Sequence, residues 1–422
     1  MIFFNKTPAP EKLNICIIAA RFPILGRAAA HGFLWPIAKA LVIAGHKVTV
    51  LSWKNPLSKP KIEQDGVEAY FLGQGYHKPF EEFSTLTLEK FTELHKKNPF
   101  HVVHCIDEFG LKVAEKKRQF RVAVAFDADA TQMSKLFALS GRSQESVRSQ
   151  IRIALAILIR YLRSFVFGTD RKVLKWADGV FVTSPQQKVV LERYYLYPEL
   201  KTFVVPYGID VSDLEPRKPS DELRKELGIP GSAKVVVTFT DMTEMEEIKN
   251  LFLAFEKVAI KKPASRLIVI GNGPLKKQIE FEMLNLALGS KVVFTGHVAN
   301  VDVPNYIALA DIFVNLSSRT SGFEPTLLEA MAQKKVIIGS EVSPISTIVE
   351  DGAEGFLVRP ADKQTLATLI LQVFTDQIDA LPIGERARQK ILGLFESDKM
   401  LIQTLSAYKQ TMVRSGLFKV KS

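Results

Sequence analysis

Cysteine is scarce in this chain, and long apolar runs are missing altogether. The two cysteines, Cys16 and Cys105, each lie inside an apolar run, which excludes a disulfide-rich secreted scaffold and indicates a reducing compartment. The longest apolar run, residues 153–159, is far shorter than the roughly 20 residues that cross a bilayer. The start of the chain has neither the cationic segment nor the cleavage site of a signal peptide. We therefore expect a cytoplasmic protein without a transmembrane helix.

The composition is that of a globular protein with more than one core. Apolar residues make up 47% of the chain and charged residues 24%, which excludes disordered and fibrous classes. A single hydrophobic core stops growing at roughly 250–300 residues, so 422 residues predict two domains.

The excess of positive over negative charge is confined to the first half. Residues 1–208 contain 30 Lys and Arg against 18 Asp and Glu, whereas the remainder contains 26 against 27. A basic first half indicates an anionic partner, such as a membrane surface, an acidic substrate or nucleic acid.

The same pattern of secondary structure occurs twice. Short β-branched runs alternate with longer amphipathic segments, which is typical of βαβ units with parallel sheets. In the first half we expect strands at 13–19, 47–52, 101–106, 122–126, 179–183 and 202–206. In the second half we expect them at 234–239, 266–271, 291–296, 312–316 and 336–340.

A segment punctuated by proline and glycine, residues 211–232, separates the two repeats. The predicted organisation is a Rossmann-like domain at 1–208, a second at 209–390, and a helical segment at 391–422 that packs back toward the first. Ligands of open α/β sheets bind outside the carboxyl ends of the strands. Two such domains facing across a cleft would therefore place the working site in that cleft.

Residues 317–332 contain a strand–loop–helix joint suited to an anion. Backbone N–H groups at a helix N-terminus carry partial positive charge, so a diphosphate is expected at residues 322–326. Glu329, one turn further along, is then placed to reach ribose hydroxyls. The structural alternative is an ordinary joint of the kind that every α/β fold contains.

This joint resembles the retaining GT-B glycosyltransferases of family four, in which Glu-Gly-Phe-Gly precedes a Leu-Glu-Ala-Met-Ala segment. The resemblance extends along nearly the whole chain in weaker motifs: Gly-His-Lys-Val-Thr-Val at 45–50, Pro-Tyr-Gly-Ile-Asp at 206–210, Gly-Asn-Gly-Pro at 271–274, Phe-Thr-Gly at 294–296 and Ala-Asp-Ile-Phe-Val at 310–314.

The resemblance implies a GT-B fold with a nucleotide diphosphate-sugar site in the second domain, an acceptor site in the first and no required metal. It implies that Glu329 binds the ribose and that Gly322 and Phe323 cradle the diphosphate. In the first domain it implies that the loop containing Gly26 and Arg27 borders the ligand.

Several positions depart from the family pattern. Ser321 replaces the first of the family's two glutamates, and Glu324 is a candidate substitute for contact with the donor sugar. Thr240 and Asp241 stand where the family has Gly-Arg, and Glu246 stands where it has a lysine. Two cations that would neutralise a departing diphosphate are thus anions. Two nearby cations are candidates to restore the balance, Lys249 and Arg319.

The segment Phe-Asp-Ala-Asp at 126–129 resembles the family's Tyr-Asp-x-His, with Asp129 in place of the histidine that faces the donor sugar. The same residues spell Asp-x-Asp, a metal motif of another glycosyltransferase fold. No supporting ligand pattern follows, so no metal is predicted.

Residues 148–175 are rich in arginine and lysine, and an apolar stripe runs along them at helical spacing. Such a helix suits an anionic membrane surface and an acceptor carried by a lipid. The alternative is a core helix with a solvated basic face. Nucleic acid is disfavoured because no recognised binding module accompanies the segment.

Two functions from different classes remain open. The first is a glycosyltransferase that moves a hexose, with retention, from a nucleotide-sugar to a glycan, lipid or small-molecule acceptor. The second is a catalytically silent homologue that acts as a binding, assembly or regulatory subunit, suggested by Asp129, Asp241, Glu246 and Ser321.

Overall fold

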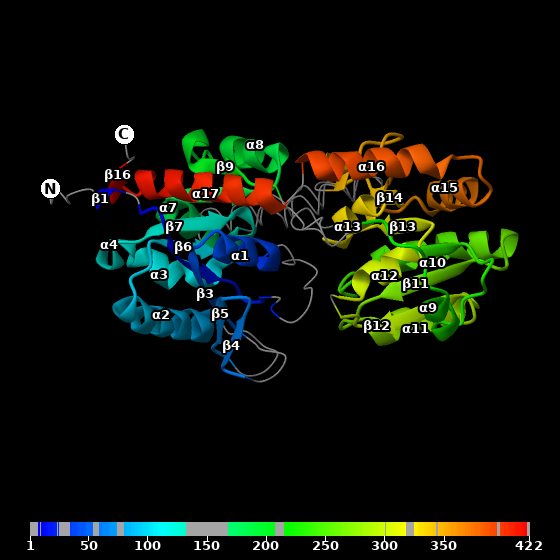
Figure 1. The fold of residues 1–422 in the computed structure, drawn as a ribbon, viewed down its shortest axis with the longest axis horizontal. Helices are drawn as coiled ribbons and strands as arrows, with labels where there is room; N and C mark the ends of the chain where they lie inside the picture. The colour runs from blue at the N-terminus through cyan, green and yellow to red at the C-terminus, as the bar shows by residue number, and fades with distance from the viewer. Residues whose placement is uncertain are drawn as a thin grey trace. The chain divides into compact units, whose positions relative to one another are not determined.

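The chain forms two compact α/β units in the computed structural model (Figure 1). Unit 1 consists of the described residues between 7 and 206 together with 397–419, and unit 2 of those between 215 and 394. The structure describes residues 7–8, 10–22, 24, 34–53, 59–73, 80–131, 168–206, 215–299, 301–317, 325–342, 345–394 and 397–419.

Unit 1 is built on an eight-stranded sheet with the order β4-β5-β3-β2-β6-β7-β8-β9. All neighbours pair in parallel except β4 and β5, which form an antiparallel hairpin. Its strands are β2 (Asn14–Ile18), β3 (Lys47–Ser52), β4 (Lys61–Gln64), β5 (Val67–Phe71), β6 (Val102–Cys105), β7 (Ala123–Asp127), β8 (Gly179–Val182) and β9 (Thr202–Val204). The central strands are buried along nearly their whole length, as expected where helices cover both faces of a parallel sheet.

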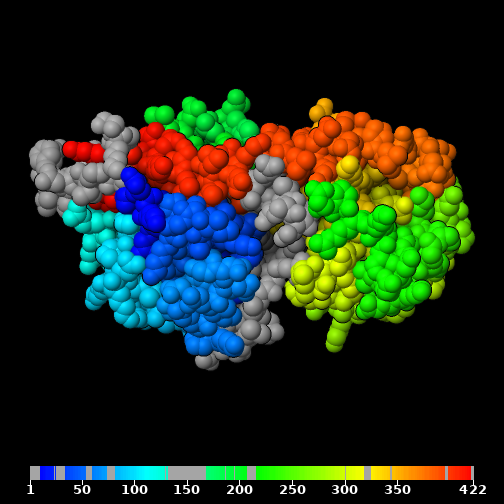
Figure 2. Space-filling model, viewed as in Figure 1, coloured from blue at the N-terminus to red at the C-terminus, as the bar shows by residue number. Residues whose placement is uncertain are grey.

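The helices of unit 1 come mostly from the first half of the chain and in one case from its end. They are α1 (Leu34–Ile43), α2 (Phe80–Lys97), α3 (Leu111–Glu115), α4 (Lys117–Phe120), α7 (Thr169–Trp176), α8 (Pro185–Tyr194) and α17 (Ser397–Arg414), with 3-10 turns η1 (Glu108–Gly110), η2 (Ala128–Ala130) and η3 (Glu199–Lys201). Helix α17 packs against α1, β7 and β8, and its red surface adjoins the blue N-terminal part of unit 1 in Figure 2. A short parallel pair, β1 (Thr7–Pro8) with β16 (Phe418–Lys419), joins the two ends of the chain.

Unit 2 is built on a six-stranded, entirely parallel sheet with the order β12-β11-β10-β13-β14-β15. Its strands are β10 (Val235–Phe239), β11 (Arg266–Ile270), β12 (Val292–Gly296), β13 (Ile312–Asn315), β14 (Val336–Ser340) and β15 (Gly355–Val358). The chain adds β11 and β12 on one side of β10 and then β13 to β15 on the other. This reversal creates a topological switch point between β10 and β13.

The helices of unit 2 pack on this sheet and on one another, with α10 against α11 and α15, and α13 against α16. They are α9 (Asp221–Glu226), α10 (Met245–Lys261), α11 (Lys276–Asn285), α12 (Val303–Ala308), α13 (Thr326–Ala332), α14 (Ile345–Ile348), α15 (Lys363–Phe374) and α16 (Ala380–Leu394). Residues 391–394, which the sequence analysis assigns to the terminal segment, are the last residues of α16 in unit 2.

The predicted α/β class with two Rossmann-like units is confirmed. The eleven strands expected from the sequence are all present, within about two residues at their ends. The hairpin β4–β5, the strand β15 and the short pair β1–β16 are additional to them. In the described ranges, no helix is long and apolar enough to cross a membrane.

Candidate active site

The carboxyl ends of three unit 2 strands surround a hollow of about 470 Å³, counting the solvent to which it opens. The hollow lies at the ends of β10, β11 and β12 and reaches Thr326, the first residue of α13. The described residues that line it are Phe239, Thr240, Asp241, Ile270, Gly271, Asn272, His297, Val298, Val303 and Thr326. Because β10 and the β13–α13 connection flank the switch point, this is the position at which open α/β sheets bind ligands.

Two glycines allow the loops after β10 and β11 to touch. A Cβ atom at Gly271 would overlap the carbonyl oxygen of Thr240, and one at Gly273 would overlap that of Asp241. Gly271 also has a φ of +128°, which side chains rarely tolerate. Its N–H donates to the carbonyl of Gly296 at 2.8 Å, which ties the β12 end to the same place. The floor of the hollow is therefore backbone, brought close by the absence of side chains.

The turn after β10 is held by its own side chains. Asp241 Oδ1 accepts hydrogen bonds from the N–H and the hydroxyl of Thr243, at 3.2 and 2.7 Å. The Met242 N–H donates to the Thr240 hydroxyl at 3.0 Å. The Asp241 carboxylate thus has a local structural task as well as a place in the lining of the hollow. The described lining contains this carboxylate and no lysine or arginine.

Helix α13 is fixed by buried contacts to its neighbours. All seven of its residues are buried, including Glu329, which is 4% exposed. At its C-terminal end, Arg388 donates to the Ala332 carbonyl at 2.6 Å and to Glu215 at 2.7 Å. Gln333 donates to the Pro304 carbonyl of α12 at 2.9 Å. The arginine satisfies one of the terminal carbonyls of α13 and complements the negative end of the helix.

The predicted cationic and acidic positions on α10 have different surroundings. Lys249 pairs with Glu282 of α11, with 3.1 Å between Nζ and Oε1. Glu246 is exposed in the first turn, where a carboxylate is favoured by the helix dipole, and it is not part of the described lining. The structure therefore places Asp241 at the hollow, Glu246 outside its described lining, and Lys249 in an ion pair between two helices.

Several predicted site residues lie outside the described residues. These are Gly26, Arg27, Arg319, Ser321, Gly322, Phe323 and Glu324. Asp129 lies in η2, directly after β7 of unit 1, and only its backbone is described. Most of the basic segment 148–175 is also outside, and residues 169–175 form part of α7.

Two lining residues were not assigned a role from the sequence. Asn272 lies two residues after the end of β11, and His297 directly follows β12, at the ends that line the hollow. Asn272 belongs to the Gly-Asn-Gly-Pro motif, and the signal that identifies His297 is its position after a parallel strand. Within the described part of the chain, no group of three or more His, Cys, Asp or Glu side chains is suited to hold a metal ion.

Residues 219–390, which make up most of unit 2, match the family described as "Glycosyl transferases group 1". The match covers less than half of the chain and lies wholly within unit 2. The matched range contains both the hollow and α13, so the family assignment and the geometry concern the same part of the molecule. The resemblance identified from the sequence motifs is confirmed for residues 219–390 by this match.

Relatives of known sequence match the chain over differing lengths, from about half of it to nearly all of it. N-acetyl-alpha-D-glucosaminyl L-malate synthase of Bacillus anthracis is 27% identical over 227 residues, which are 54% of this chain and 58% of that protein. The match therefore spans little more than half of that relative's length.

Solved structures share the fold over nearly the whole chain. Sucrose-phosphate synthase from Thermosynechococcus elongatus has a TM-score of 0.76 at 21% identity, covering 95% of this chain and 100% of that one. Anabaena HepE, solved in complex with UDP and glucose, has a TM-score of 0.71 at 19% identity, covering 94% and 99%. These likenesses establish the GT-B fold for this chain.

Proposed function

We propose that this chain is a retaining glycosyltransferase that moves a hexose from a nucleotide-sugar to a hydroxyl group of a glycan, lipid or small-molecule acceptor. The observation that carries the proposal is the hollow at the switch point of the unit 2 sheet, bordered by Thr326 at the start of α13. A nucleotide diphosphate needs a concave site beside a helix N-terminus, and this hollow has that form.

Catalysis in the proposed reaction consists of orientation and charge stabilisation. The acceptor hydroxyl forms a bond to the sugar carbon as the bond from that carbon to the diphosphate breaks, and the hydroxyl proton passes to the departing phosphate oxygen. The diphosphate gains negative charge during this step, so fixed dipoles and cations directed at it lower the barrier. No resident metal is part of the proposal.

The proposed binding roles follow the family pattern. Glu329 holds the ribose, the segment containing Gly322 and Phe323 holds the phosphates, and Ser321 or Glu324 holds the sugar. Lys249 and Arg319 supply positive charge to the diphosphate. In the first domain, Gly26, Arg27 and Asp129 border the ligand, and residues 148–175 provide a basic surface for an anionic membrane.

A second candidate function is a catalytically silent homologue that serves as a binding or assembly subunit. The charge of the hollow favours it, because the described lining presents Asp241 and no lysine or arginine. A carboxylate beside a diphosphate weakens binding unless other charges or dipoles compensate for it.

Calorimetric titration with UDP, GDP and ADP separates the two candidates. For the transferase we expect one of the three to bind, and we expect Glu329→Gln to weaken that binding about tenfold through a lost charge-assisted hydrogen bond. Glu280→Gln, on the exposed part of α11, is the matched control and is expected to bind as the wild type does. Absence of binding by all three nucleotides would eliminate the transferase.

A further inference from the structure

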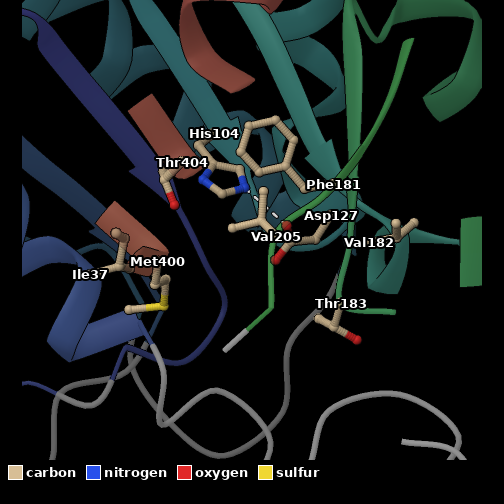
Figure 3. A pocket seen from close by; sticks show the side chains of 9 residues that line it. All are labelled: Ile37, His104, Asp127, Phe181, Val182, Thr183, Val205, Met400 and Thr404. Atoms are coloured by element: carbon tan, nitrogen blue, oxygen red, sulfur yellow. Dashed lines mark hydrogen bonds and ion pairs between the residues drawn. The ribbon is translucent and has the colours of Figure 1, made fainter. Parts of the chain in front are cut away.

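Three polar side chains of unit 1 form a continuous hydrogen-bonded chain that none of the predicted roles uses. Tyr408 Oη lies 2.8 Å from His104 Nδ1, and His104 Nε2 lies 3.0 Å from Asp127 Oδ1. The three residues come from α17, β6 and β7 (Figure 3 shows the histidine and the aspartate). The C-terminal helix is thereby linked to the carboxyl end of a central strand.

Burial makes these contacts energetically significant. Tyr408 is fully buried, His104 is 6% exposed, and the ring of Phe181 lies against both, with centroids 4.8 Å from His104 and 5.5 Å from Tyr408. A buried polar group without a hydrogen-bond partner lowers the stability of the folded state. Removal of any one of the three side chains would leave its neighbour in that condition. Burial also raises the pKa of Tyr408 well above its usual value, which keeps its hydroxyl protonated.

The chemistry of the acceptor atoms determines which group donates in each of the two hydrogen bonds. A carboxylate has only acceptor oxygens, so His104 Nε2–H donates to Asp127 Oδ1. The other ring nitrogen of a neutral imidazole is an acceptor, so the Tyr408 O–H donates to Nδ1. Asp127 thus selects the Nε2–H tautomer of His104, and Tyr408 orients the ring through its contact with Nδ1.

The Asp127 carboxylate does not cap the 3-10 turn that follows it. Asp127 precedes η2 in the N-cap position, yet its side chain makes no capping hydrogen bond. Its carboxylate instead lines a small pocket at the carboxyl ends of β6, β7 and β8, with a side chain that is 14% exposed (Figure 3). Thr183 and Thr404 are the other polar groups of that pocket apart from His104, and its remaining described walls are apolar.

We propose that this pocket is an acceptor-side subsite in which Asp127 accepts a hydrogen bond from a neutral hydroxyl group, with His104 and Tyr408 as positioning residues. The inference rests on the proposed transferase function. The pocket lies at the strand ends where α/β sheets bind ligands. Its described lining contains a carboxylate and no lysine or arginine, so a neutral alcohol suits it and an anion does not, although unit 1 as a whole is basic.

The kinetic test uses the full-length chain with UDP-glucose as donor and two acceptors that share a skeleton, glycerol and glycerol 3-phosphate. We expect transfer to glycerol in preference to its phosphate. Tyr408→Phe keeps the buried ring and removes the donor, and it is expected to lower kcat/KM for glycerol about tenfold while the Kd of UDP stays within about twofold. Asp127→Asn is expected to lower it further.

Tyr195→Phe is the matched control. Tyr195 is also a buried tyrosine of unit 1, and its hydroxyl donates to the buried carboxylate of Asp170 at 2.9 Å, away from the pocket. A purely structural role for Tyr408 predicts equal kinetic constants in the two variants. That equality, or a preference for glycerol 3-phosphate, would overturn the subsite.

A spectroscopic arm distinguishes failure of the subsite from failure of the transferase function. In ¹⁵N-histidine NMR spectra, assigned with His104→Gln, we expect His104 as the Nε2–H tautomer and a shift of its Nδ1 resonance in Tyr408→Phe but not in Tyr195→Phe. Absence of turnover of UDP-, GDP- and ADP-glucose alike in the wild type would reject the transferase and, with it, the subsite. The Nδ1–H tautomer would reject the positioning chain whether or not the protein turns over UDP-glucose.

Discussion

At the scale of single residues, the shape of the unit 2 hollow depends on two glycines that lack a side chain. Gly271 and Gly273 bring the backbone of two loops into contact, and the turn after β10 is closed by Thr240 and Asp241. A nucleotide that binds here meets backbone N–H and C=O groups in fixed positions. The structure therefore gives a steric reason for the two glycines of the Gly-Asn-Gly-Pro motif: a side chain at either position would overlap the backbone of the loop after β10.

Replacing Gly271 by alanine tests this cause. The new methyl group would overlap the Thr240 carbonyl at a φ of +128°, so we expect Gly271→Ala to destabilise unit 2 by at least about 2 kcal/mol and to abolish nucleotide binding. Gly231→Ala, whose Cβ would meet no atom within 4 Å, is the control and is expected to be neutral. Urea unfolding and UDP titration check both variants, and normal binding by Gly271→Ala would contradict the steric argument.

A partly buried lysine provides a pH test in the same unit. Burial lowers the pKa of Lys335 to about 8, and its ammonium group donates to the Ala308 carbonyl at 2.8 Å. Between pH 8 and about 10.5 the folded state releases this proton while the unfolded state keeps it, so the contribution of Lys335 to stability rises with pH. Below pH 8 both states are protonated and the cost of the buried charge is fully present.

We therefore expect the free energy of unfolding of the wild type, relative to Lys335→Met, to rise by about 1 kcal/mol between pH 7 and pH 9. Denaturant titrations of both proteins at the two values measure this difference. A difference independent of pH would mean that the lysine keeps its ordinary pKa in the folded protein.

At the scale of elements, the sequence predicts most clearly the strands that are buried along their whole length. The runs that became β2 and β10 are β-branched and buried throughout, which gives them a strong signal. The strand β4 is mostly exposed and polar, and only its hairpin turn, Asp65 and Gly66 with positive φ, is a recognisable signal.

The site is less accessible to sequence reasoning than the fold. Asn272 and His297 become visible only once their strands are aligned in the sheet. The contact between His104 and Tyr408 spans 304 residues, and no local pattern encodes it. Charge arguments that assign Lys249 to a diphosphate do not anticipate Glu282, because that residue belongs to a different helix.

The pairing of α10 with α11 gives a test of the role proposed for Lys249. If the diphosphate recruits this lysine, Lys249→Ala should weaken UDP binding about tenfold at low salt, because one opposite charge is lost from a partly exposed site. Lys276→Ala removes a comparable ion pair, with Glu280 on α11, and serves as the control. Equal UDP affinities in the two variants would leave Lys249 with a structural role alone.

At the scale of the whole molecule, the charge is divided between the two halves. The excess of basic residues lies entirely in residues 1–208, which fits the proposal that the segment 148–175 contacts anionic lipid. Attraction of this kind is electrostatic and weakens as salt screens it.

Sedimentation with vesicles that contain phosphatidylglycerol tests that surface. We expect the wild type to bind at low salt, and replacement of Arg152, Arg160 and Arg163 by serine to reduce binding by roughly tenfold or more, at about 1 kcal/mol per basic residue near the membrane. If the three replacements leave vesicle binding unchanged, the segment does not contact the membrane, and its basic residues face solvent instead.

The central claim is that the chain transfers a sugar from a nucleotide donor bound at unit 2. The most direct measurement is the turnover of UDP-, GDP- and ADP-glucose by the full-length protein, with the anomeric configuration of the product read by proton NMR. The account predicts release of the nucleoside diphosphate from at least one donor and a product with the α configuration of that donor. Binding of a nucleotide-sugar without any turnover, or a product of β configuration, would contradict it.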